Sequence, residues 1–236
     1  MILKVEHISK SFNGLNVLKD VSFLVHAGTI TSLFGENGSG KTTLFHIIAG
    51  FLKPTSGNVY FQNENLHHKS ADEIDELGIG RTWQSPRIFK NLSVQDNLLL
   101  ATKDHPGERL FNYILKPGII WREEKRRKIR ANEVCGDVGL AGKLQKTAGA
   151  LSYGQQKLLS IGMLLMNDAE LLLLDEPFAG VNTQMIDAIS KVLLQLKESG
   201  KTVLLVEHNR SKATEISDKV LHLVKGSIEE QEFITP

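Results

Sequence analysis

Residues 30–50 read ITSLFGENGSGKTTLFHIIAG, and this stretch decides the fold. A short apolar run, residues 30–34, stops at Gly35, and apolar residues recur at helical spacing after a glycine-rich turn. The turn matches the pattern G-x-x-x-x-G-K-[ST], which marks a phosphate-binding loop when a strand precedes it and a helix follows. We therefore predict a strand, a phosphate-binding loop and a helix, in that order.

The residue types in this loop suit a polyphosphate. Three glycines let the backbone curl and aim successive N–H groups inward, and the following helix adds the positive end of its dipole. Lys41 is placed to reach the terminal phosphates, and the Thr42 hydroxyl is placed to hold Mg²⁺. The predicted binding residues are Gly35, Glu36, Asn37, Gly38, Ser39, Gly40, Lys41, Thr42 and Thr43.

Composition limits the possible classes of protein. The 236 residues suit one large domain, or a core with a small subdomain. With 28 basic and 27 acidic residues the formal net charge is +1, so we expect no nucleic-acid partner. Residues 1–10 show no signal pattern, and no apolar run reaches the length of a membrane span, so we expect a cytoplasmic location. The single cysteine, Cys135, is expected to be a buried, inert thiol.

The pattern of apolar and polar residues changes twice along the chain. Residues 2–9 and 21–25 alternate apolar and polar positions around an Asn13-Gly14 turn, which predicts antiparallel strands. From residue 170, short apolar runs alternate with amphipathic helices, which predicts a parallel sheet covered on both faces.

The region between these parts is mostly helical in pattern. It contains a helix over 93–102, an insertion over 103–118 and a charged helix over 121–138, whose charges are expected to form a solvated face. We predict a core over 1–84 and 149–236, and a helical subdomain over 85–148.

Two acids end a buried strand. Leu171 to Leu174 are followed by Asp175 and Glu176, at the edge where open parallel sheets bind their ligands. Asp175 fits a residue that orients Mg²⁺ through its water shell, and Glu176 is placed to accept a proton from an attacking water or to orient it.

A second anion site is predicted where a long helix begins. Residues 151–156, LSYGQQ, open this helix, and Ser152 and Gln155 have capping-box spacing. A helix N-terminus with little bulk at Gly154 also favours an anion. Two phosphate-binding ends in one chain suggest a nucleotide shared between two copies.

The motifs together resemble the ATP-binding subunits of ABC transporters over nearly the full chain. They occur in the order of that family, as GENGSGKT (35–42), RTWQSPRIF (81–89), LSYGQQK (151–157), LLLLDEP (171–177) and LLVEHN (204–209). The resemblance implies an α/β P-loop NTPase fold with a mostly parallel core sheet, an N-terminal antiparallel β-subdomain and a helical subdomain. It also implies ATP and Mg²⁺ as ligands, and ATP hydrolysis.

The resemblance further implies roles for individual residues. Phe12 would stack on adenine, and Gln84 would contact Mg²⁺ and the attacking water. His208 would touch the γ-phosphate, so the implied catalytic set is Glu176, His208, Gln84 and Lys41, and the implied metal set is Thr42, Gln84 and Asp175. Ser152, Gly154 and Gln155 would bind the γ-phosphate held by the opposite protomer.

Departures from the commonest motifs point to a subfamily. Tyr153 replaces a glycine in the signature, and Asn182 stands where the family usually has aspartate. The chain is similar to the ATPases of branched-chain amino acid importers in four features: Tyr153, the RTWQ motif, the insertion and DEPFAGVN (175–182). The alternative within the family is the ATPase of lipopolysaccharide export. After Gly226 only ten residues remain, and we expect no regulatory domain there.

The implied partners are a second ATP-binding subunit, identical or different, transmembrane permease subunits and, through them, a solute-binding protein. The implied location is peripheral, on the cytoplasmic face of the membrane. Two other classes stay open: a soluble ABC ATPase that acts on nucleic acid or ribosomes, and a nucleotide-binding scaffold without turnover.

Overall fold

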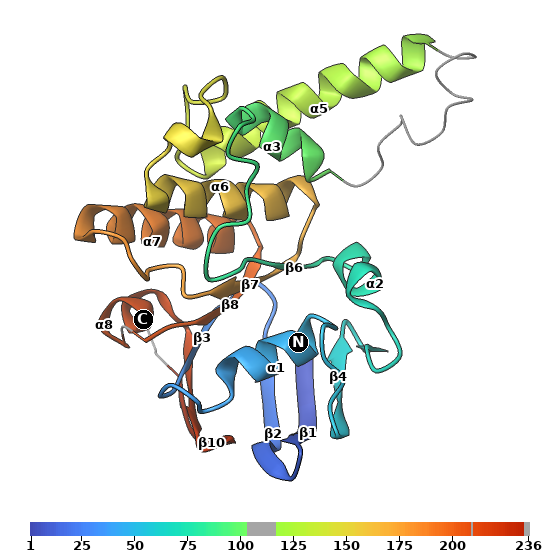
Figure 1. Cartoon of the computed structure of the whole chain (residues 1–236), viewed down its shortest axis with the longest axis vertical. Helices are drawn as coiled ribbons and strands as arrows, with labels where there is room; N and C mark the ends of the chain where they lie inside the picture. The colour runs from blue at the N-terminus through green and yellow to red at the C-terminus, as the bar shows by residue number, and fades with distance from the viewer. Residues whose placement is uncertain (103–116, 209, 234–236) are drawn as a thin grey trace. The chain divides into compact units, whose positions relative to one another are not determined.

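The structure, a computed structural model, describes residues 1–102, 117–208 and 210–233. The chain forms two compact units (Figure 1). The first, here called the core unit, contains residues 1–84 and 169–236, and the second, the helical unit, contains residues 85–168.

Ten strands and four helices make up the described part of the core unit. The strands are β1 (Leu3–Phe12), β2 (Leu15–Val25), β3 (Ile30–Phe34), β4 (Ser56–Phe61), β5 (Glu64–Asn65), β6 (Ile79–Arg81), β7 (Leu171–Asp175), β8 (Thr202–Val206), β9 (Lys219–Val224) and β10 (Ser227–Phe233). The helices are α1 (Lys41–Ile48), α2 (Ala71–Glu76), α7 (Thr183–Glu198) and α8 (Arg210–Ile216).

The N-terminal strands form an antiparallel sheet in the order β2-β1-β4-β5. Phe12 pairs with Leu15, so Asn13 and Gly14 form a two-residue hairpin turn. Both turn residues have positive φ, 48° and 85°, as a turn that matches strand twist requires. The predicted turn and antiparallel strands are therefore confirmed.

The second sheet has six strands in the order β10-β9-β3-β8-β7-β6. β9, β3, β8, β7 and β6 pair in parallel, and only β10 pairs antiparallel, with β9. The predicted α/β class with a mostly parallel core sheet is confirmed. Because β3, β8 and β7 run in one direction, their carboxyl ends meet at the same edge.

Both faces of the six-stranded sheet are covered. The main apolar core joins side chains of both sheets with α1, and it takes alternate residues of each central strand, such as Leu171 and Leu173 of β7. Strand residues two apart share a face, so the buried residues between them, such as Leu172 and Leu174, face the other way. Helices α7 and α8 contact β8 and β3 respectively, as a doubly covered parallel sheet requires.

The helical unit contains α3 (Val94–Leu100), α5 (Pro117–Asp137), a short 3₁₀ turn (Ala148–Ala150) and α6 (Tyr153–Met166). The three α-helices contact one another. The structure corrects the predicted boundary at residue 148, because α6 packs on α3 and α5 and extends the helical unit to Asp168.

The predicted insertion over 103–118 falls mostly outside the described residues. Pro117 and Gly118 form the first turn of α5, where proline is tolerated because that N–H has no partner within the helix. The helix therefore begins four residues before its predicted start at Trp121. Within the described ranges, no helix has the length and apolar character needed to cross a membrane.

Cys135 lies on α5, fully buried, and its thiol donates to the backbone oxygen of Leu140 at 3.0 Å. Burial raises the pKa of the Cys135 thiol, so the reactive thiolate is disfavoured. The predicted burial of Cys135 is confirmed.

One buried asparagine organises the start of the helical unit. Asn97 on α3 is fully buried, and its amide oxygen accepts from the Phe89 N–H at 2.8 Å. Its amide nitrogen donates to the Phe89 oxygen at 3.0 Å and to the Ser93 oxygen at 2.9 Å. Asn97 thus holds residues 89–93 against α3.

We expect Asn97→Ala to lower the free energy of unfolding by about 2–4 kcal/mol, because polar backbone groups of the 89–93 segment lose their partner. Urea unfolding followed by circular dichroism measures this loss. The matched control is Asn132→Ala, since Asn132 is exposed on α5, and we expect it to change the value by less than about 0.5 kcal/mol. Equal losses in both variants would contradict the assigned role of Asn97.

Candidate functional site

The turn between β3 and α1 has the backbone shape that its glycines permit. A Cβ atom on Gly35 would lie 2.4 Å from the Leu223 carbonyl oxygen, so no other residue fits there. Gly40 caps α1 with φ 108°, a conformation that side chains rarely adopt. The predicted strand, loop and helix are therefore all present.

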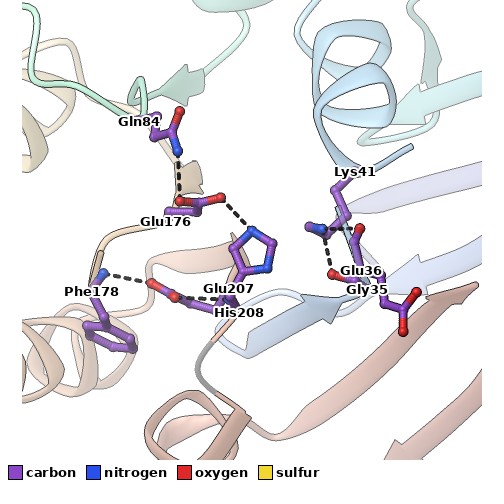
Figure 2. Close-up of polar contacts among 8 residues, drawn as sticks. All are labelled: Gly35, Glu36, Lys41, Gln84, Glu176, Phe178, Glu207 and His208. Carbon is purple, nitrogen blue, oxygen red and sulfur yellow. Dashed lines mark hydrogen bonds and ion pairs between the residues drawn. The ribbon is translucent and has the colours of Figure 1, made fainter. Parts of the chain in front are cut away.

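Lys41 points back at its own loop. Its Nζ donates to the carbonyl oxygens of Gly35 at 2.6 Å and Glu36 at 2.9 Å (Figure 2). Burial lowers the pKa of Lys41, and the negative charges of Glu176 and Asp175 act against this shift. A buried ammonium held by carbonyl oxygens is suited to exchange them for phosphate oxygens.

Glu176 follows β7 and has contacts on both carboxylate oxygens. Gln84 Nε2 donates to Oε2 at 2.9 Å, and His208 Nε2 lies 2.8 Å from Oε1 (Figure 2). Glu176 also has φ 50°, a strained value for a residue with a side chain, of a kind that clusters at functional sites. The structure thus brings together three of the four residues of the implied catalytic set.

Asp175, the last residue of β7, is buried and paired. Its Oδ2 accepts from Arg81 Nη2 at 3.0 Å, with 4% of the Arg81 side chain and 9% of the Asp175 side chain exposed. Its backbone N–H donates to the Thr82 hydroxyl at 3.2 Å. The end of β6 therefore fixes both the side chain and the main chain of Asp175.

Aromatic rings surround the Arg81 guanidinium. Its carbon lies 4.7 Å from the ring centre of Trp83, 5.8 Å from that of Phe45 and 5.9 Å from that of Phe51. The sequence analysis did not predict a role for Arg81. Its place at the end of a short apolar strand, three residues before Gln84, was a signal that could have identified it. The sequence analysis also missed Glu207, whose buried carboxylate accepts from the Phe178 N–H at 2.6 Å.

The remaining predicted residues of the core unit lie as follows. Glu36, Asn37, Gly38 and Thr42 are exposed, Ser39 is buried and Thr43 is half-buried. Phe12 ends β1 with 43% of its surface exposed, and Lys10 Nζ lies 5.0 Å from its ring centre. Asn182 caps α7, since its side-chain oxygen accepts from the Met185 N–H at 2.9 Å.

In the helical unit, the start of α6 has the predicted capping box. The Ser152 hydroxyl accepts from the Gln155 N–H at 3.3 Å, and the Gln155 side-chain oxygen accepts from the Ser152 N–H at 3.2 Å. Gly154 is buried within the first turn. Tyr153 is 41% exposed, and the Nζ of the buried Lys157 lies 5.3 Å from its ring centre.

The sequence matches a known family. A family model described as "ABC transporter" matches residues 18–179, well over half of the chain. This chain belongs to the ABC transporter family. It is an ATP-binding subunit of such a transporter, and its reaction is ATP hydrolysis.

Similar proteins support the same placement. A probable branched-chain amino acid transport ATP-binding protein of Archaeoglobus fulgidus is 36% identical over 96% of this chain and 87% of its own length. The high-affinity branched-chain amino acid transport ATP-binding protein of Escherichia coli K12 is 31% identical over 96% of this chain and 89% of its own.

Two solved structures are also similar. A nucleotide-free ATP-binding cassette from an ABC transporter has a TM-score of 0.85 at 34% identity, covering 99% of this chain and 92% of its own. A dimeric cassette in a post-hydrolysis state, bound to ADP and Pi, has a TM-score of 0.81 at 25% identity, covering 100% of both chains.

We expect Arg81→Ala to lower the free energy of unfolding by about 3–5 kcal/mol, because it leaves the Asp175 carboxylate buried without the guanidinium. Chemical denaturation measures the loss, and adding Asp175→Asn to the variant should restore part of it. The control is Lys4→Ala, which breaks the half-exposed Lys4–Glu6 pair and should cost less than about 1 kcal/mol. A small and equal cost in both variants would contradict a buried, stabilising pair.

Proposed function

We propose that the loop from Gly35 to Thr43 binds the phosphates of ATP, and that Glu176 acts on the attacking water. The observation that carries the proposal is the pair of contacts on Glu176, from Gln84 and from His208. They place an amide, an imidazole and a carboxylate together at the edge of the sheet where the phosphate-binding loop also emerges.

The residues present fit a magnesium nucleotide. Among the described residues, the Ser39 hydroxyl is buried in the loop without a hydrogen bond, and a phosphate oxygen would supply one. Thr42, Gln84 and Asp175 offer hydroxyl, amide and carboxylate oxygens, the donor types that Mg²⁺ prefers. We propose these three as the residues that hold the metal, which when bound neutralises charge on the phosphates.

Each group of the proposed catalytic set has a separate task. Lys41 exchanges its carbonyl contacts for the terminal phosphates and neutralises their charge. Glu176 orients the water and accepts its proton as the water oxygen bonds to the γ-phosphorus and ADP leaves. His208 then stabilises charge on the γ-phosphate, and Gln84 positions the water.

Two further contacts complete the proposed nucleotide site. Phe12 stacks on adenine, which its exposed position at the end of β1 permits. Ser152, Gly154 and Gln155 of one protomer bind the γ-phosphate held by the other, because the start of α6 offers backbone N–H groups and a helix dipole. Hydrolysis therefore requires two protomers closed around two ATP molecules.

We propose branched-chain amino acid import as the transport process. The similar proteins from Archaeoglobus fulgidus and Escherichia coli are named for branched-chain amino acid transport, which supports this cargo. The proposed assembly pairs this subunit with a second ATP-binding subunit on the cytoplasmic face of a transmembrane permease. A solute-binding protein delivers the cargo to that permease.

We expect Glu176→Gln to abolish turnover and to trap an ATP-bound dimer, because the amide cannot accept the proton while ATP binding by the loop persists. Phosphate release and size-exclusion chromatography with ATP measure the two effects. The control is Glu170→Gln, which removes an exposed carboxylate that contacts Gln62 and should leave turnover within about twofold of the original chain. Unchanged turnover in Glu176→Gln would remove Glu176 from the role of base.

The transport assignment is tested by an affinity pull-down of the tagged chain from detergent-solubilised membranes, with mass spectrometry of the bound proteins. We expect two polytopic membrane proteins and a second ATPase, and a solute-binding protein would support the proposed cargo. Recovery of lipopolysaccharide-export components would instead favour the alternative system. Recovery of ribosomal or DNA-associated proteins alone would contradict a role in transport.

A further inference from the structure

Glu207 is a buried acid that the proposed reaction does not use. It follows directly after the apolar strand β8, and 2% of its surface is exposed. Burial of a carboxylate is costly unless hydrogen bonds compensate for the lost water. Its contacts therefore indicate why the chain places an acid there.

The two carboxylate oxygens of Glu207 accept from two different loops. Oε1 accepts from the Phe178 N–H at 2.6 Å, and Oε2 accepts from the His208 N–H at 3.2 Å (Figure 2). Phe178 belongs to the segment between Glu176 and Asn182, which follows β7, whereas His208 belongs to the segment after β8. One side chain thus bridges the segments that follow two neighbouring strands.

These contacts close a ring that includes the proposed base. His208 Nε2 lies 2.8 Å from Glu176 Oε1, and the Glu176 carbonyl oxygen accepts from the Ala179 N–H at 3.2 Å. The Glu176 N–H in turn donates to the Val206 oxygen at 3.0 Å, on the strand that ends beside Glu207. Glu176, Phe178, Glu207 and His208 therefore have linked positions.

We propose that Glu207 is a positioning residue that couples the segment 177–181 to His208. Displacement of that segment moves the Phe178 N–H and, with it, the buried Glu207 carboxylate. The carboxylate then moves the backbone of His208, and so the imidazole that contacts Glu176. This inference rests on the proposed function, because it assumes the proposed roles of Glu176 and His208.

The chemistry of a carboxylate explains why this residue is not an amide. An ionised carboxylate has two acceptor oxygens and can satisfy two N–H donors, one on each oxygen. A glutamine has one acceptor oxygen and an NH₂ group, which cannot accept from a second N–H. Glu207→Gln therefore keeps the size of the side chain, but its single acceptor oxygen can serve only one of the two N–H groups at a time, so neither segment is held continuously.

The experiment compares the original chain, Glu207→Gln, Glu207→Asp and the control Glu170→Gln in the ATP-loaded state. Steady-state ATP hydrolysis gives kcat and KM, and hydrogen–deuterium exchange with mass spectrometry reports on the amides of residues 177–181 and 207–208. We expect kcat to fall roughly tenfold or more in both Glu207 variants, while KM changes less than about threefold, because Lys41 and its loop are unchanged.

The exchange data separate coupling from a merely structural role. We expect exchange to become roughly tenfold faster in both segments of Glu207→Gln and to stay unchanged in the phosphate-binding loop. Faster exchange in only one segment, or a normal kcat with a lowered melting temperature, would overturn the coupling. Since exchange is read independently of turnover, an inactive original chain would count against the proposed function, whereas uncoupled exchange would count against the role of Glu207.

Discussion

The parallel pairing of β3, β8 and β7 is the constraint on which the rest of this molecule depends. The register joins Ile30 to Val203 and Leu171 to Thr202, so the three strands end at the same edge of the sheet. The phosphate-binding loop, His208 and Glu176 follow those three ends. All three strands are buried, so packing on both faces fixes their positions. The starting points of the segments that follow them are therefore fixed as well.

Charge at this edge is held in place by partners within the core unit. The Arg81 guanidinium pairs with Asp175, Lys41 contacts the carbonyl oxygens of its own loop, and the Glu207 carboxylate accepts from two backbone N–H groups. Burial makes each of these groups costly to leave unpaired, which restricts the positions they can occupy. Contacts within the core unit therefore organise the proposed site, and we expect a bound nucleotide to replace some of them.

Local sequence patterns predicted most of the fold. Periodicity located β7, β8 and the long helices, and the Asn13-Gly14 turn and the capping box at Ser152 predicted two boundaries. These signals worked because each depends on residues close together in the chain. The domain boundary at residue 148 failed because the packing of α6 on α3 and α5 is a long-range property that periodicity does not reveal.

The same distinction holds for the site. The loop lysine and the two acids after β7 belong to contiguous motifs, so the sequence alone was enough to predict a role for each. The roles of Arg81 and Glu207 could not be read in this way, because each depends on a distant partner. Arg81 pairs with Asp175, 94 residues away, and Glu207 accepts from Phe178, 29 residues away. A charged residue at the end of an apolar strand was the available signal in both cases.

The most direct test of the account is a structure of this protein with Mg²⁺ and a non-hydrolysable ATP analogue. We expect Lys41 Nζ to leave the carbonyl oxygens of Gly35 and Glu36 for the terminal phosphates, with the start of α6 from a second protomer at the γ-phosphate. Nucleotide bound elsewhere, or Lys41 still held by its own loop beside the bound analogue, would contradict the account.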